Sequence, residues 1–304
     1  RVKMFILFPH NKESEIQRKQ MTTVKKENVF NIAIKGNFDD CQNIVKSLFE
    51  RNNREKKYNL AAVNSINWVR IMGQIVYYFW SYLNLIKNDE KINFAVPTGN
   101  FGNIYAGFLA KKMGLPINKL VIASNSNDVL TRFFENGVME KKTAVKTISP
   151  SMDIQVSSNF ERLLFYVLKE NDQKVSTYMQ NLKDQGSFKL EQQEISEIKK
   201  DFRAVKIGDK ETLSIIKEIY NKEKFIIDPH TATAFGAIKK LEEFKDVVVL
   251  GTAHPYKFFE TVKKATGEII NPPSQLDNFV DKDEKFDIVE NNNSKIKNYI
   301  LSKL

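Results

Sequence analysis

Apolar runs alternate with helical patterns in the first part of the chain, and this alternation constrains the fold more than any other feature. Residues 4–8 and 29–34 predict strands, and amphipathic stretches at 14–22 and 39–49 predict helices. We expect Ser14 to cap the first helix and Asp39 or Asp40 to begin the second. Strands that alternate with helices pair in parallel through right-handed crossovers. The sequence therefore predicts an α/β fold with mostly parallel sheets.

The strand predicted at residues 92–96 leads into a glycine-containing turn. The turn reads Pro97-Thr98-Gly99-Asn100-Phe101-Gly102-Asn103, and a helical pattern continues to residue 113. We expect Gly99 and Gly102 to adopt positive φ and to let the backbone approach a ligand. Free N–H groups at the start of a helix attract anions. The turn predicts a phosphate site, with a purely structural turn as the alternative, and it matches neither nucleotide motif, GxGxxG or GxxxxGK[ST].

A second junction of this kind lies near the end of the chain. The apolar run 247–250 predicts a buried parallel strand, and it ends in Gly251-Thr252-Ala253-His254-Pro255. Ligands of open α/β sheets bind at the carboxyl ends of the strands, so the two junctions are expected to share one site. Thr252 offers a hydroxyl there, and His254 is either an acid–base group or a hydrogen-bonded loop histidine.

A long helix is predicted between the two halves of this pattern, at residues 64–86. Its apolar side chains recur at three- and four-residue spacings, which is typical of a buried helix, and its polar interruptions leave it short of a membrane span. Asn64, Ser65 and Asn67 stand where helix caps are expected. Arg70 lies about one turn beyond Asn67, and we expect both side chains to face the same ligand-binding cleft.

The rest of the chain is expected to carry less chemistry. Residues 51–58 predict a polar loop, 158–222 a run of helices with few strand signals, and 226–231 a turn that opens a helix at 232–244. After Pro272-Pro273 the chain becomes polar, and we expect a loosely packed tail.

Composition excludes several classes of protein. The formal net charge is +10, but the basic residues are interleaved with acidic ones, which indicates a solvated surface rather than a nucleic-acid interface. The single cysteine, Cys41, and three scattered histidines predict no disulfide and no metal site. No secretory signal is expected, and the chain fits a reducing, cytoplasmic compartment.

In combination, the motifs resemble the threonine synthase family. The glycine turn, with Val96-Pro97-Thr98 before it and Met113-Gly114-Leu115-Pro116 after it, is similar to the phosphate loop of that family. Further similar segments follow in family order: 8–9, 14–21, 36–45, 64–70 (NSINWVR), 149–164, 228–232 (DPHTA) and 251–258 (GTAHPYKF).

The resemblance implies a pyridoxal-phosphate enzyme of fold type II, similar to the tryptophan synthase β subunit, with two open twisted sheets. Residues 1–60 would be the remaining half of a small mobile domain. Residues 61–304 would be a large cofactor-binding domain with a helical insertion at about 158–222 and a polar C-terminal tail. The implied reaction is the last step of threonine biosynthesis, in which a lyase converts O-phospho-L-homoserine and water to L-threonine and phosphate.

The resemblance also implies roles for individual residues. The backbone of Gly99, Asn100, Phe101, Gly102 and Asn103 would hold the cofactor phosphate, and Thr252 would pair with the pyridine nitrogen. The expected substrate-side residues are Asn64, Ser65, Asn67, Arg70, Ser149 and Asn159.

The catalytic lysine of the family is the one departure from this pattern. The Schiff-base lysine belongs to a Phe-Lys-Asp segment expected upstream of Arg1. Phe244-Lys245-Asp246 repeats the tripeptide, but it precedes the strand at 247–250 and so lies at the amino end, away from the predicted site. We therefore expect no catalytic residue in this chain, which would not turn over alone.

Two other functions remain open from the sequence. A threonine-synthase-like phospholyase would share the phosphate loop, and a non-catalytic fragment would bind pyridoxal phosphate or a phospho-ligand without turnover. The expected partner is a small phospho-amino acid, with no nucleic acid or membrane, and the expected state is a monomer or homodimer.

Overall fold

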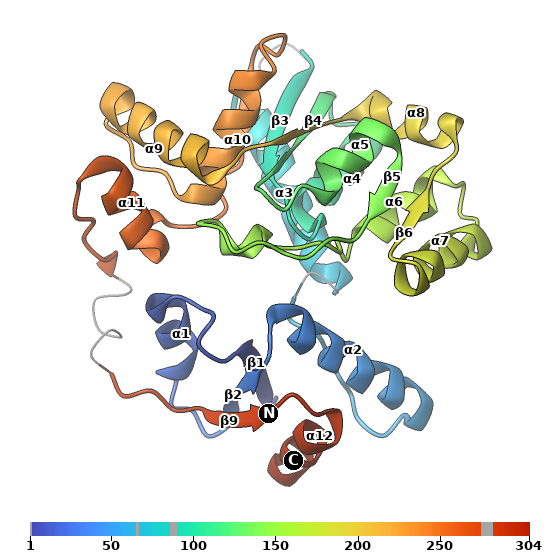
Figure 1. Ribbon diagram of the computed structural model, residues 1–304, viewed down its shortest axis with the longest axis vertical. Helices are drawn as coiled ribbons and strands as arrows, with labels where there is room; N and C mark the ends of the chain where they lie inside the picture. The colour runs from blue at the N-terminus through green and yellow to red at the C-terminus, as the bar shows by residue number, and fades with distance from the viewer. Residues whose placement is uncertain (1, 65–66, 86–89, 275–281) are drawn as a thin grey trace. The chain divides into compact units, whose positions relative to one another are not determined.

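A computed structural model describes residues 2–64, 67–85, 90–274 and 282–304 (Figure 1). The chain divides into two compact units: unit 1 comprises Arg1–Ala61 and Asn271–Leu304, and unit 2 comprises Ala62–Ile270. Within the described residues, no helix combines the length and the apolar character that crossing a membrane requires.

A parallel four-stranded sheet forms the centre of unit 2. Its strands are β3 (Ile92–Pro97), β4 (Ile117–Ser124), β7 (Phe202–Lys206) and β8 (Val247–Val249), in the order β7-β4-β3-β8. Every residue of β3 is buried, as expected for a central strand covered on both faces. The predicted parallel sheet is confirmed.

Helices cover both faces of this sheet. On one face, Phe94 and Val96 of β3 join a large apolar core with α3 (Trp68–Leu85) and α4 (Gly102–Lys112). On the other face, Ala95 packs in a second cluster with α10 (Pro229–Lys240). Because successive strand residues point to opposite faces, the alternation in β3 fixes which helix lies on which side.

Helices α3 and α4 approach each other closely at Gly107. A Cβ at this position would lie 2.4 Å from Cε1 of Tyr78 and 2.9 Å from Cδ2 of Leu120. Tyr78 is fully buried, and its hydroxyl donates a 2.9 Å hydrogen bond to the backbone oxygen of Asn103 in α4. Glycine at 107 therefore makes room for the ring that joins the two helices.

The sequence prediction of a buried helix at 64–86 is wrong for one side of α3. Ile71, Tyr78 and Tyr82 are buried, but the opposite face is exposed, with Trp80 69% and Leu83 72% accessible. The helical spacing of apolar residues indicates that a helix has an apolar side, but it does not determine how much of that side the fold covers. In unit 2, α3 packs against α4 on its buried face.

Several smaller elements complete unit 2. They are α5 (Val129–Asn136), β5 (Val138–Glu140), the 3-10 helix η1 (Pro150–Met152), α6 (Phe160–Val167), α7 (Asp172–Asp184), β6 (Ser187–Lys189), α8 (Gln192–Asp201), α9 (Asp209–Glu223), the 3-10 helix η2 (Pro255–Phe258) and α11 (Phe259–Thr266). The stretch 158–222, predicted to be a run of helices with few strand signals, also contains the strands β6 and β7, and β7 is an edge strand of the main sheet. The sequence did not predict β7 because Arg203 and Lys206 interrupt its apolar pattern, and charged residues of this kind are common in edge strands.

Unit 1 is built on a three-stranded parallel sheet. Its strands are β1 (Met4–Pro9), β2 (Val29–Lys35) and β9 (Asp287–Glu290), with β2 in the middle. The helices of the unit are α1 (Glu15–Thr22), α2 (Phe38–Glu55) and α12 (Asn293–Lys303). The two β-α pairs predicted at the start of the chain are confirmed.

The C-terminal residues differ from the loosely packed tail that we expected. Their strand β9 extends the sheet of unit 1, and Ile296 of α12 is fully buried against Ile32 and Ile44. These residues thus belong to unit 1, whereas the sequence placed them at the end of the large domain. The pairing joins positions more than 250 residues apart, which local sequence patterns do not report.

The boundaries of α2 also differ from the prediction. Its N-cap is Asn37, which forms a capping box with Asp40, so Asp40 lies inside the first turn. At its other end the helix continues to Glu55, through most of the segment predicted as a loop. An ion pair between Arg51 and Glu55, 2.6 Å apart, stabilises this polar last turn.

Glycine 107 gives a test of the α3–α4 contact. We expect Gly107→Ala to lower the free energy of unfolding by about 1–3 kcal/mol, because Tyr78 is held by its hydrogen bond and cannot move aside. Gly73→Ala is the matched control: among the described residues, apart from its own helix backbone and chain neighbours, nothing lies within 4 Å of a Cβ added to that helical glycine, and we expect a gain of up to about 1 kcal/mol. Urea unfolding measures both, and equal effects of the two substitutions would contradict the packing described.

A charged contact in unit 1 predicts a dependence on pH. Arg18 donates two 2.8 Å hydrogen bonds to Glu284, and these hold the pKa of Glu284 at about 2, below its ordinary 4.5. The carboxylate therefore stabilises the fold above pH 4.5, and this contribution is lost as the pH falls toward 2.

At pH 7 we expect Glu284→Gln to be less stable than the unmodified chain by about 1–3 kcal/mol. The difference should shrink as unfolding is measured at successively lower pH. A difference that stays constant from about pH 7 to about pH 3 would show that the carboxylate charge does not matter.

Candidate functional site

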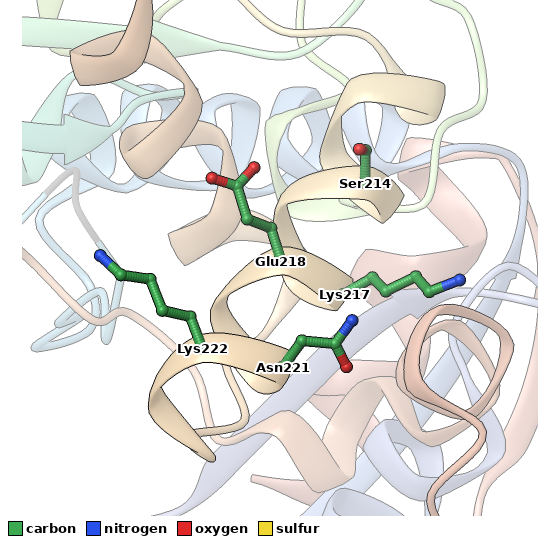
Figure 2. Close-up of a pocket in the computed structure, with 5 residues that line it drawn as sticks. All are labelled: Ser214, Lys217, Glu218, Asn221 and Lys222. Atoms are coloured by element: carbon green, nitrogen blue, oxygen red, sulfur yellow. The ribbon is translucent and has the colours of Figure 1, made fainter.

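An open hollow on α9 lies outside the predicted site. It is lined by Ser214, Lys217, Glu218, Asn221 and Lys222, which all come from a single solvent-facing helix (Figure 2). Glu218 pairs with Lys239 of α10 at 2.7 Å, so its charge is already compensated. The hollow contains none of the residues that the sequence predicts to bind a ligand.

The glycine turn lies at the carboxyl end of β3, as predicted. Thr98 donates a backbone hydrogen bond of 2.8 Å to the oxygen of Ala123 in β4, and α4 begins at Gly102. The positive φ expected at Gly99 and Gly102 is wrong: the left-handed residue is Phe101, with φ +64°. Phe101 is also the N-cap of α4, and its own side chain forms no capping hydrogen bond.

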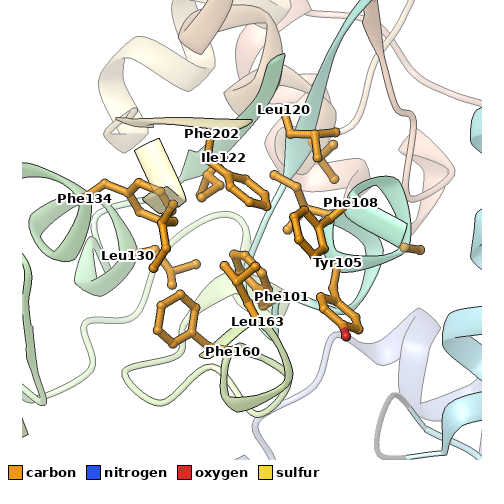
Figure 3. Close-up of a cluster of buried hydrophobic side chains, with 14 of the residues drawn as sticks. Phe101, Tyr105, Phe108, Leu120, Ile122, Leu130, Phe134, Phe160, Leu163 and Phe202 are labelled. Atoms are coloured by element: carbon orange, nitrogen blue, oxygen red, sulfur yellow. The ribbon is translucent and has the colours of Figure 1, made fainter. Parts of the chain in front are cut away.

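Packing of the Phe101 ring holds this unfavourable backbone conformation. The residue is 1% exposed, and its ring lies 5.3 Å from that of Phe160 and 5.8 Å from that of Phe202 (Figure 3). A non-glycine residue in the left-handed region costs about 1–2 kcal/mol. Burying a large aromatic side chain outweighs that cost, so the ring fixes the turn to the core.

Gly99 is required for a different reason from the one predicted. A Cβ at this position would lie 2.9 Å from the backbone oxygen of Ser151 and 3.1 Å from Cα of Met152. The close approach is therefore made by another loop of this chain. That loop leaves no room for a side chain on Gly99.

The backbone N–H groups of residues 99–104 are suited to bind an anion. Among the described residues, none of these six N–H groups has an acceptor, and Phe101, Gly102 and Ile104 are buried. Buried backbone donors are almost always paired, so a run of unpaired ones at an uncapped helix start requires water or a ligand. The helix dipole favours a negative charge at this point.

The carbonyl groups of the turn are held from the other side. Ser157 donates a 2.5 Å hydrogen bond to the oxygen of Gly99, and Asn159 donates two, of 3.1 and 3.0 Å, to the oxygen of Asn100. Asn159, predicted as a substrate residue, is 1% exposed and acts as a support of the turn in this structure. The carbonyls of Gly99 and Asn100 are therefore occupied, whereas the N–H groups of the turn have no acceptor among the described residues.

Thr252 is placed at the same edge of the sheet. Strand β8 runs parallel to β3, and Leu250 donates a 3.0 Å hydrogen bond to Ala95, so the residues after Leu250 lie beside the end of β3. Thr252 is exposed, which leaves its hydroxyl accessible. The two junctions therefore lie at the same edge of the sheet, and that they share one ligand site stays a prediction.

His254 takes the structural role that was left open for it. Its Nδ1 accepts a 3.2 Å hydrogen bond from the backbone of Tyr256 and caps η2. The residue is exposed at the surface. This contact agrees with a hydrogen-bonded loop histidine.

The residues before α3 are partly committed to the backbone around them. Asn67 accepts from the backbone of Val69 and donates to Ala62 at 2.8 Å, so it caps the helix as expected on structural grounds. Asn64 accepts a 3.0 Å backbone bond from Asn67, and Ser65 lies outside the described residues. Arg70 is exposed, and within the described ranges its side chain has no hydrogen-bond or ion-pair partner.

Arg162 connects this segment to the turn, and sequence reasoning missed it. Its guanidinium lies 5.7 Å from the ring centre of Trp68, and its Nε donates a 3.0 Å hydrogen bond to Oδ1 of Asn159. Asn159 in turn bonds to Asn100. A lone arginine in a helical pattern carries no signal of such contacts, which depend on the fold.

Ser149 belongs to a buried polar network and precedes the loop residues Ser151 and Met152, which pack against Gly99. Its hydroxyl accepts from Nδ2 of Asn125 at 3.0 Å, and Asn125 also donates to Asp153 at 2.8 Å. Burial raises the pKa of Asp153, although hydrogen bonds from Thr147 and Asn125 oppose the effect. The network fixes the loop, and Ser149 is 1% exposed, so its role here is structural support.

The Phe-Lys-Asp tripeptide lies at the opposite edge, as predicted. The backbone oxygen of Lys245 accepts a 3.0 Å bond from Asn93 at the start of β3, and Asp246 directly precedes β8. Both contacts are at the amino ends of strands. The tripeptide is thus away from the turn and from Thr252.

Comparisons with known proteins agree with this geometry. The family described as "Threonine synthase, C-terminal" matches residues 231–300. The threonine synthase of Pseudomonas aeruginosa is 44% identical over 302 residues, which are 98% of this chain and 64% of that protein. That of Saccharomyces cerevisiae is 44% identical over 89% of this chain and 57% of its own length. The chain spans less than two thirds of these relatives.

Solved structures show the same fold. A threonine synthase from Brucella melitensis, crystallised with pyridoxal phosphate bound, superimposes with a TM-score of 0.89 and 42% identity over 99% of this chain and 65% of its own. The yeast threonine synthase gives 0.87 with 40% identity, over 99% and 65%. The predicted α/β architecture of fold type II is confirmed.

Substitutions at Phe101 test whether burial of the ring stabilises the left-handed backbone. We expect Phe101→Ala to destabilise the fold by about 3–5 kcal/mol, because it empties a buried aromatic position. Phe101→Gly removes the same ring but relieves the backbone, so it should be more stable than the alanine variant by about 1 kcal/mol. Thermal or urea unfolding compares the two, and the usual order, alanine above glycine, would rule out backbone strain at this residue.

Proposed function

We propose that this chain, which belongs to the threonine synthase family, provides the phosphate-binding part of a pyridoxal-phosphate enzyme. The proposed reaction converts O-phospho-L-homoserine and water to L-threonine and phosphate. The observation that carries the proposal is the run of six unpaired N–H groups at residues 99–104 of the described chain, at the edge of the sheet where Thr252 also lies.

The residues at this edge fit the cofactor. A phosphate monoester accepts several hydrogen bonds and carries a negative charge, and the turn offers backbone donors at the positive end of α4. An exposed hydroxyl just beyond the end of the neighbouring strand β8 suits the far end of a ring whose phosphate sits in the turn. When bound, pyridoxal phosphate supplies an electron sink for carbanion chemistry.

In this proposal the residues of the chain divide into binding and supporting groups. The backbone of Gly99, Asn100, Phe101, Gly102 and Asn103 binds the phosphate, and the hydroxyl of Thr252 bonds to the pyridine nitrogen. A hydroxyl keeps that nitrogen mostly unprotonated, unlike a carboxylate. Tyr78 and Asn159 orient the turn through Asn103 and Asn100.

Arg70 is the residue that we assign to the substrate. It is exposed, its side chain is uncommitted within the described ranges, and it lies three residues beyond Asn67 on the first turn of α3. A guanidinium binds phosphate or carboxylate in a bidentate manner. We also place Asn64 and Ser65 on the substrate side, and we assign the lysine that binds the cofactor covalently to the part of the relatives that this chain does not span.

Substitutions at Thr252 test the proposal in the complete reading frame that encodes this chain. We expect release of inorganic phosphate from O-phospho-L-homoserine, and Thr252→Val should lower kcat/KM by about tenfold or more through loss of one hydrogen bond to the cofactor. Thr252→Ser is the matched control and should keep most of the activity, because it keeps the hydroxyl.

Two results would count against the proposal. Absence of phosphate release would exclude the reaction, and faster release from O-phosphothreonine than from O-phospho-L-homoserine would favour a phospholyase.

Unfolding temperatures serve as a control for stability. Because Thr252 is exposed, they should be equal for the unmodified protein and the Thr252→Val and Thr252→Ser variants.

A further inference from the structure

A buried aspartate–histidine pair stands at the start of α10. Asp228 is 1% exposed and His230 is 3% exposed, and the carboxylate oxygen Oδ1 lies 2.9 Å from Nδ1 of the ring. The same carboxylate caps the helix by accepting from the backbone N–H groups of His230 and Thr231. The ring also packs against Phe258, with ring centres 4.7 Å apart.

The other ring nitrogen contacts the loop next to the glycine turn. Nε2 of His230 accepts a 3.3 Å hydrogen bond from the backbone N–H of Ser151. An N–H group can only donate, so Nε2 must carry a lone pair. The proton of a neutral imidazole then sits on Nδ1, where the carboxylate of Asp228 accepts it.

Ser151, which contacts His230, also packs against the glycine turn. Its backbone oxygen is the atom closest to the position of a Cβ on Gly99, at 2.9 Å. The loop that begins here continues through Ile154 to Ser157 and Asn159, which bond to the carbonyls of Gly99 and Asn100. The position of Ser151 therefore helps to set where the free N–H groups of the turn lie.

We propose that Asp228 and His230 are positioning residues for the phosphate site. Asp228 selects the tautomer of His230 that presents a lone pair to Ser151, and this bond keeps the loop against Gly99. The inference rests on the proposed function, because it assigns the turn a phosphate. In this inference, neither Asp228 nor His230 contacts the ligand.

Two substitutions separate this role from general support of the fold. His230→Gln keeps an acceptor near the position of Nε2 but has no second nitrogen for Asp228 to hold, whereas His230→Leu removes the acceptor. Asp228→Ser keeps a good helix cap but takes the carboxylate away from the ring, so the proton is no longer fixed on Nδ1.

Titration of the whole chain with inorganic phosphate measures the effect on the turn. We expect His230→Leu and Asp228→Ser each to weaken binding about 5- to 10-fold, the effect of losing one buried hydrogen bond. His230→Gln should remain within about twofold of the unmodified chain, and Asp228→Ser should add little in the His230→Gln background, because the pair acts as one unit.

Nitrogen-15 NMR of the histidine ring and hydrogen exchange of the Ser151 amide give readouts that do not need a ligand. We expect the unmodified chain to show an unprotonated Nε2 and a protected Ser151 amide, and Asp228→Ser to lose both. A protonated Nε2 in the unmodified chain, or unchanged protection of Ser151 in His230→Leu, would overturn the inference.

Failure of the proposed function gives a different result. If the unmodified chain binds no phosphate while the tautomer and the Ser151 protection are as expected, the phosphate assignment is wrong and the pair still positions the loop.

Discussion

The left-handed backbone of Phe101 is the constraint on which the candidate site depends. Its φ of +64° lies between the end of β3 and the start of α4, at the N-cap of a helix whose first N–H groups have no acceptor among the described residues. This conformation is unfavourable for any residue with a side chain, and it persists because the ring is buried among Phe160 and Phe202. The hydrophobic core of unit 2 thus maintains the geometry of a polar site.

Support of the turn from other segments gives it rigidity without using its donors. Ser157 and Asn159 occupy the carbonyls, the backbone of Ser151 closes on Gly99, and Tyr78 bonds to Asn103. Among the described residues, all of these contacts leave the N–H groups of residues 99–104 free. A site of this kind is organised before a ligand arrives, so little binding energy is lost in ordering the loop.

Sequence patterns predicted the structure correctly where it depends on interactions between residues close in sequence or on the parallel pairing of strands. The alternation of strands and helices predicted the sheets, and the polarity of parallel strands predicted that the turn after β3 and Thr252 share an edge. Patterns failed where one residue's role depends on another far away: Asn159 supports Asn100, Arg162 packs on Trp68, and β9 completes a sheet that starts at Met4. The prediction that the glycines of the turn adopt positive φ was also wrong. Gly99 is required because a neighbouring loop packs against it, and the residue with positive φ is Phe101.

The sequence by itself determined the elements, their order and the chemistry available at each junction, because strand and helix periodicity, capping residues and glycine positions act over a few residues. Only the tertiary structure decided which of those groups are free to bind. Asn67, Ser149 and His254 are committed to caps or buried networks, whereas Thr252 and the N–H groups after Thr98 are not, within the part of the chain that the structure describes. A hydrogen-bonding group serves a ligand only if the fold leaves it without a partner, and partners are assigned by contacts between distant parts of the chain.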